Sequence, residues 1–179
     1  MSVRAAHYLK LLSHILFITL LGNSMSVLAD TDEEHSYIAA FSLQVVNFID
    51  FPTNYEQANV CFAGVDSFKV ATSAKQHVQL KNLSLKVKVI SEASVQQLLP
   101  QKCHIVYVAP LTIIDKPLIQ TLGESALVIG NSDDFKSFGN SAAIVFENTR
   151  PQVSISKQQL KRSNFEVKSR LLDAVTVVP

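Results

Sequence analysis

Few side chains in this 179-residue chain have a type and spacing that could do chemistry. Asp133 and Asp134 place two carboxylates side by side, whereas acid/base catalysis needs two carboxylates that face each other across a cleft. Neighbouring acids in a loop are more often helix caps. The sequence has no G-x-G-x-x-G, G-x-x-x-x-G-K-[ST] or G-x-S-x-G motif. It therefore predicts neither a phosphate-binding loop nor a nucleophile elbow.

The histidines do not form a metal-binding pattern. His35, His77 and His104 are far apart in the sequence and are not paired with one another. His104 lies inside an apolar run, where a hydrogen-bonded histidine of the core or of a strand edge is the expectation. These patterns predict a protein that is not an enzyme and that carries no metal and no cofactor.

Patterns typical of strands and helices alternate along the first two thirds of the chain. Strands are expected at residues 59–65, 83–90, 103–109 and 126–129, and helices at 36–51, 68–77, 92–99 and 112–122. Later come a turn or short helix at 133–138, a hairpin of 142–146 with 152–155, a helix at 156–162, and a segment 165–178 that fits strand or helix. Helices between strands imply parallel pairing. The expected fold is a single α/β domain with a mainly parallel sheet flanked by helices and a late antiparallel hairpin.

The N-terminus has the order of a secretory signal. Arg4, His7 and Lys10 precede an apolar stretch at residues 11–21, and Val27-Leu28-Ala29 supplies small residues at a cleavage site. A membrane anchor is the alternative, but spanning a bilayer takes about 20 apolar residues. We expect a signal peptide at residues 1–29, cleavage after Ala29, and a periplasmic domain at residues 30–179.

The charge of that domain is nearly balanced. Arg4 and Lys10 account for two of the 16 Lys and Arg residues, so 14 remain against 15 Asp and Glu residues. Such a balance gives no electrostatic attraction to nucleic acid.

The two cysteines, Cys61 and Cys103, suggest a disulfide, because exported chains with an even number of cysteines commonly form them. Each lies near the start of an apolar strand, and neighbouring strands are close enough for a bridge if both side chains point to one face. Two buried thiols are the alternative.

Four local patterns resemble the YfiR-like family. The first is Asn47-Phe48-Ile49-Asp50-Phe51-Pro52, similar to the end of that family's first helix. The second is Cys61-Phe62-Ala63-Gly64-Val65-Asp66-Ser67-Phe68, which resembles its C-x-x-G-x-D-P-F segment. The third is Cys103-His104-Ile105-Val106-Tyr107, and the fourth spreads over residues 127–172. The chain departs from the family pattern at Phe51 (usually Trp), Ser67 (Pro), Asn140 (the second Gly of a Gly-Gly turn) and Ser156 (a common Asn).

The resemblance implies a periplasmic repressor that acts by protein–protein interaction. Family members bind the periplasmic domain of an inner-membrane diguanylate cyclase and inhibit it, which lowers cyclic di-GMP and biofilm formation. An OmpA-like outer-membrane lipoprotein can sequester the inhibitor. The resemblance also supports the disulfide, and a homodimer is kept as an alternative assembly.

Two sets of residues are candidates for binding. Exposed apolar side chains drive association, so the partner surface is expected among Phe51, Phe68, Phe135 and Phe138, of which at least half should be core residues. A periplasmic sensor of a small ligand is the alternative function. Open α/β sheets bind ligands beyond the carboxyl ends of their strands, where Asp66, Asp133 and Arg170 are the candidate ligand-binding residues.

Overall fold

The computed structural model describes residues 26–51, 57–64, 66–76, 84–91, 102–110, 112 and 114–179, with side chains from residue 31 onward except that of Lys136. The chain divides into two compact units, Met1–Glu33 and Glu34–Pro179. All the described strands belong to the second unit, which therefore holds both the seven-stranded sheet and a two-stranded one.

Seven strands form one mixed sheet in the second unit. Their spatial order is β3 (Ser84–Ile90), β2 (Gln57–Ala63), β4 (Ile105–Val108), β5 (Leu127–Gly130), β6 (Ala142–Glu147), β7 (Arg150–Ser156) and β9 (Thr176–Val178). The first five are mutually parallel, β6 and β7 pair antiparallel, and β9 is parallel to β7. The unit is therefore a single α/β domain with a mostly parallel sheet and a late antiparallel pair, as the sequence predicts.

The central strands are apolar because both faces of the sheet are covered. All four residues of β4 are buried. Since side chains alternate along a strand, Ile105 and Tyr107 belong to the hydrophobic cluster on one face, and Val106 and Val108 to the cluster on the other. The apolar run that predicts a buried strand thus separates two cores.

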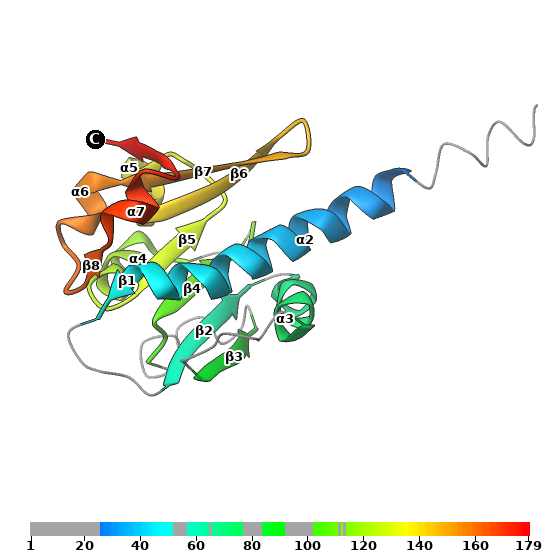
Figure 1. Ribbon diagram of the computed structural model, residues 1–179, viewed down its shortest axis with the longest axis horizontal. Coiled ribbons are helices and arrows are strands. Elements are labelled where there is room, and N and C mark those ends of the chain that lie inside the picture. Colours follow the sequence, from blue (N-terminus) through cyan, green and yellow to red (C-terminus); the bar gives the residue numbers. More distant parts are fainter. Residues whose placement is uncertain are drawn as a thin grey trace, which may run out of the picture. The chain divides into compact units, whose positions relative to one another are not determined.

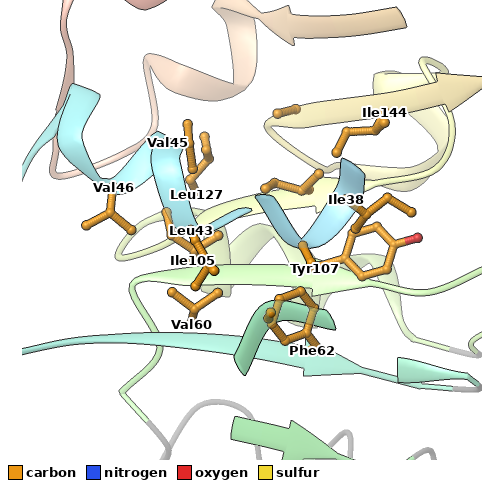
Figure 2. Close-up of a cluster of buried hydrophobic side chains, with 14 of the residues drawn as sticks. Ile38, Leu43, Val45, Val46, Val60, Phe62, Ile105, Tyr107, Leu127 and Ile144 are labelled. Carbon is orange, nitrogen blue, oxygen red and sulfur yellow. The ribbon is translucent and has the colours of Figure 1, made fainter. Parts of the chain in front are cut away.

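The first face is covered by residues of α2 (Ser26–Gln44) that belong to this unit, by the 3₁₀-helix η1 (Val45–Phe48) and by α3 (Ser67–Gln76). Figure 2 shows Ile38 and Leu43 of α2 over Ile105 and Tyr107 in this cluster. Burial raises the pKa of the Tyr107 phenol, and the Glu34 carboxylate acts in the same direction. The second face is covered by α4 (Lys116–Gly123), whose Ile119 and Leu122 pack on Val106 and Val128.

The C-terminal elements return to the start of the domain. The short helices α5 (Phe135–Phe138) and α6 (Lys157–Leu160) flank the β6–β7 hairpin in sequence. Farther on, β8 (Glu166–Val167) pairs antiparallel with β1 (Ile49–Asp50), and α7 (Ser169–Leu172) leads into β9. In Figure 1 the orange and red C-terminal segments lie beside the end of α2 and β1.

The structure corrects three element boundaries. The helix expected at residues 36–51 begins earlier, at Ser26, and ends at Gln44, because Ile49 and Asp50 are extended and pair with β8. The helix expected at 112–122 begins only at Lys116, with Pro117 in its first turn. The segment 165–178 contains two short strands and a helix. The helix expected at 92–99 lies outside the described residues.

Candidate functional site

The carboxyl ends of β2 and β4 lie side by side at the point of the sheet where the order of the strands reverses. From β2 the chain first adds β3 on one side and then places β4 on the other. Ligands of open parallel sheets bind at such a point. Gly64 directly follows β2 and has φ 99°, and its N–H donates to the Ile90 carbonyl at 3.1 Å. This edge is the candidate functional site.

Thr112 packs directly against Gly64. A Cβ atom at residue 64 would overlap the Thr112 side chain, lying 2.6 Å from its Cγ2 atom. A glycine therefore meets two demands here, the positive φ and the close approach of a neighbouring side chain. The contact places Thr112 at the end of β2.

A cavity of about 420 Å³ opens beside this contact. Pockets for small ligands have volumes of about 300–1,000 Å³ and are mostly apolar, and this cavity fits both criteria. Its apolar lining comes from β4 and the residue after it, β5, α4 and the segment before it, and α5: Val108, Ala109, Val128, Ile119, Ile114 and Phe138. Its remaining lining is Gly130 with the polar residues Thr112, Asn131, Ser132 and Asn140.

The predicted ligand-binding residues do not line this cavity. Asp66 is exposed, has φ 59°, and forms an ion pair with Lys69 at 3.1 Å. Asp133 is also exposed, and Arg170 lies on α7, whose buried Leu171 belongs to the core of the first face. Their role in binding a small ligand stays a prediction.

The four aromatic residues predicted to contact a partner differ in how far they are exposed to solvent. Phe135 is buried, at 7% exposed, and so is a core residue rather than an anchor. Phe51 is half-buried, with its ring 5.2 Å from that of His104 and 5.6 Å from that of Phe165. Phe68 and Phe138 are 69% and 51% exposed. They follow the carboxyl ends of β2 and β5 in the chain, and the contact of any of these residues with a partner stays a prediction.

His104 is a structural residue. Its side chain is buried, and its Nδ1 accepts a hydrogen bond from the Asn59 N–H at 2.9 Å. Burial lowers the pKa of His104; the backbone of Asn59 opposes this shift, and the positive charge of Lys88 adds to it. The ring is therefore neutral near pH 7 and carries its proton on Nε2.

Cys61 and Cys103 form a disulfide, with Cα atoms 5.9 Å apart. Cys61 lies in the middle of β2, and Cys103 precedes β4. Val60 pairs with Ile105, so the bridge runs diagonally between the two strands instead of joining residues at the same level. Both cysteines belong to the cluster under α4, which confirms that their side chains share one face.

Thr112 and Asn140 were not predicted as site residues. Neither belongs to a recognisable motif, and they are brought together by the ends of β4 and β5 and the start of β6. One signal was visible in the sequence: Asn140 stands where the family pattern has a glycine. Among the described residues no group of three or more His, Cys, Asp or Glu side chains could hold a metal ion.

The fold and this edge define a small α/β domain, and comparison with known proteins shows its family. The model of the YfiR/HmsC-like family matches residues 35–175, so this chain belongs to that family. Membership supports a role as a periplasmic regulator of diguanylate cyclase, and members of the family are regulators rather than enzymes.

Two further comparisons add little to the function. A conserved domain protein from Vibrio cholerae O1 biovar El Tor has a crystal structure similar to this one, with a TM-score of 0.47 and 12% identity. The match covers 79% of this chain but only 60% of that one. The sequence matches no curated protein. In the described part of the chain, no helix is both long and apolar enough to cross a membrane.

Proposed function

We propose that this chain binds the periplasmic domain of an inner-membrane diguanylate cyclase and inhibits it, which lowers cyclic di-GMP and biofilm formation. The observation that carries the proposal is the family match over residues 35–175. The disulfide fits an oxidising compartment such as the periplasm. The action is therefore stoichiometric binding of a protein rather than turnover of a substrate.

Export is part of the proposal. Residues 1–29 are removed as a signal peptide, and the domain of residues 30–179 begins at Asp30. Mass spectrometry of the protein from the periplasmic fraction tests this. A mature N-terminus at Asp30 is the expected result, and a protein that keeps Met1 would contradict it.

The contact with the cyclase involves Phe68 and Phe138. These are two of the three large apolar side chains that are exposed in the described residues, Val89 being the third. Exposed aromatic side chains supply much of the energy of protein association. Phe68 lies in the first turn of α3, and Phe138 lies at the end of α5.

The experiment measures cyclase inhibition directly. Cyclic di-GMP is measured in a deletion strain that expresses the cyclase and is complemented with wild-type protein, Phe68→Ala, Phe138→Ala or the exposed control Lys69→Ala. We expect deletion to raise cyclic di-GMP, and the wild type and Lys69→Ala to restore it. At least one aromatic variant should restore it poorly while unfolding like the wild type. Unchanged cyclic di-GMP on deletion would overturn the proposal.

Sequestration by an OmpA-like outer-membrane lipoprotein, and a homodimer, are further proposed assemblies. Both can be tested by sizing the purified protein alone and with the lipoprotein. A second candidate function, a periplasmic sensor of a small ligand, is favoured by the cavity beside Thr112. A sensor would change its melting temperature with a small molecule, whereas an inhibitor would change it with a partner protein.

A further inference from the structure

We propose that the cavity at the carboxyl edge of β4 and β5 receives a bulky apolar side chain of the cyclase's periplasmic domain. The inference rests on the proposed function, and it names the pocket in which that domain is anchored. Phe138 connects the two, because this side chain lines the cavity and is also exposed to solvent. The cavity therefore reaches the surface at a residue that the proposed function assigns to the contact with the cyclase.

The lining of the cavity selects an uncharged, apolar occupant. Six of its eleven lining residues are aliphatic or aromatic, and the other five are uncharged. Moving an ionised group into such surroundings without a counter-charge is strongly unfavourable, which excludes lysine, arginine and the acidic side chains. An apolar side chain gains free energy instead, roughly in proportion to the area that it removes from water.

The cavity extends from the surface to the core of the second face. Its volume of about 420 Å³ is far larger than the roughly 30 Å³ that one water molecule takes up in the liquid. Phe138 and Asn131 are exposed lining residues, whereas Val108, Ile119 and Val128 are buried and belong to that core. A side chain that enters would leave water completely, as do the few residues that supply most of the energy of a protein interface.

The loop after β5, which supplies part of the lining, is held in place by a buried amide. Asn140 Nδ2 donates to the carbonyl of Ser132 at 3.2 Å and to that of Ala142 at 2.6 Å. Ser132 lies in this loop and Ala142 begins β6, so the amide ties the loop to the sheet. A pocket whose walls are already ordered costs less to occupy, because little conformational freedom is lost on binding.

The first experiment detects the inserted side chain directly. The mature protein with ¹³C-labelled methyl groups is mixed with the unlabelled periplasmic domain of the cyclase from the same organism, and intermolecular NOEs are recorded. We expect NOEs from the methyl groups of Val108 and Ile119 to protons of the cyclase domain.

The same samples separate the possible failures. A cyclase domain that binds without any NOE from these methyl groups would overturn the insertion and leave the proposed function standing. A cyclase domain that does not bind the wild-type protein would overturn both. Methyl signals of Val108 and Ile119 that shift with toluene but not with the cyclase domain would assign the cavity to a small ligand, and would also overturn the insertion.

Two matched substitutions test the pocket by affinity. Val108→Ile adds one methyl group at a residue that lines the cavity, whereas Val153→Ile adds the same group on β7, at a partly buried residue outside the lining. One such group changes binding in a hydrophobic pocket by about tenfold or more. We expect calorimetric titration to show about tenfold weaker binding of the cyclase domain to Val108→Ile and unchanged binding to Val153→Ile. A Val108→Ile variant that binds as tightly as the wild type, or that melts several degrees lower because the cavity has no room for the methyl group, would overturn the proposal.

Discussion

Asn59 and His104 hold each other through two hydrogen bonds between β2 and the start of β4. The Asn59 N–H donates to His104 Nδ1 at 2.9 Å, and the His104 N–H donates to the Asn59 carbonyl at 2.8 Å. The second bond continues the parallel ladder, whereas the first uses a side chain as acceptor and needs an unprotonated Nδ1. The pairing of these strands is therefore coupled to the charge of one imidazole.

This pair predicts that acid destabilises the protein. Because the pKa of His104 is lowered in the folded state, the unfolded state binds the proton more readily. Stability should be complete above the unfolded histidine pKa of about 6.5 and fall as the pH decreases below it. Urea unfolding between pH 5 and pH 8 measures this. His104→Asn, which keeps an acceptor near the Nδ1 position, should flatten the curve. Curves of equal slope for wild type and His104→Asn would contradict the assignment.

The disulfide predicts that reduction lowers the stability of the protein by a large amount. It joins residues 42 positions apart, for which loop-closure entropy gives about 4 kcal/mol of stabilisation. Cys61→Ala should lower the free energy of unfolding by about this amount, as should reduction of the wild type. Removing both cysteines should cost little more than removing one, because the bond is already lost. A Cys61→Ala variant that melts within about a degree of wild type would show that the bond is not structural.

The contact of Gly64 with Thr112 predicts a specific intolerance. Gly64→Ala should destabilise the protein by about 1–3 kcal/mol, because the new methyl group overlaps Thr112 and the φ of 99° is unfavourable for alanine. Gly123→Ala is the matched control, since a Cβ there meets only Ser141 Oγ at an ordinary 3.6 Å. It should not destabilise the protein and should stabilise it by about 0.4–1 kcal/mol, because alanine restricts the unfolded chain. Chemical denaturation measures the free energy of unfolding of the two variants, and an equal loss of stability in both would contradict this contact.

Near the C-terminus, the packing of a buried side chain should contribute more to the free energy of unfolding than an exposed ion pair does. Lys168 Nζ lies 3.0 Å from Asp50 Oδ1, but both side chains are about half exposed, so Lys168→Ala should cost less than about 1 kcal/mol. Leu171, three residues later, is buried in the core of the first face. Leu171→Ala should cost about 2–5 kcal/mol. Urea midpoints of the two variants measure the contrast, and a larger loss for Lys168→Ala would refute it.

The sequence predicted the elements whose signals are local. The run from Cys103 to Ala109 indicated a buried strand, and β4 is buried along its whole length. The end of α2 was placed too late because Ile49 and Asp50 are extended only through pairing with residues far along the chain. Likewise, nothing near Asn140 or Thr112 indicates that strand register places both beside one cavity. Phe135 was a candidate anchor by residue type alone, and residue type does not distinguish a surface aromatic from the buried one found here.

The pairing of β1 with β8 has a consequence for the order of folding. Lys168 Nζ also donates to the Asn47 carbonyl, a contact between residues 121 positions apart. Contacts of such long range slow folding, because the ends of a long loop must meet before they gain any energy. This corner cannot form until almost the whole chain is present. During synthesis and transport, β1 would therefore stay unpaired until the last residues of the chain are available. A chain truncated before Glu166 would lack β8, the partner strand of β1.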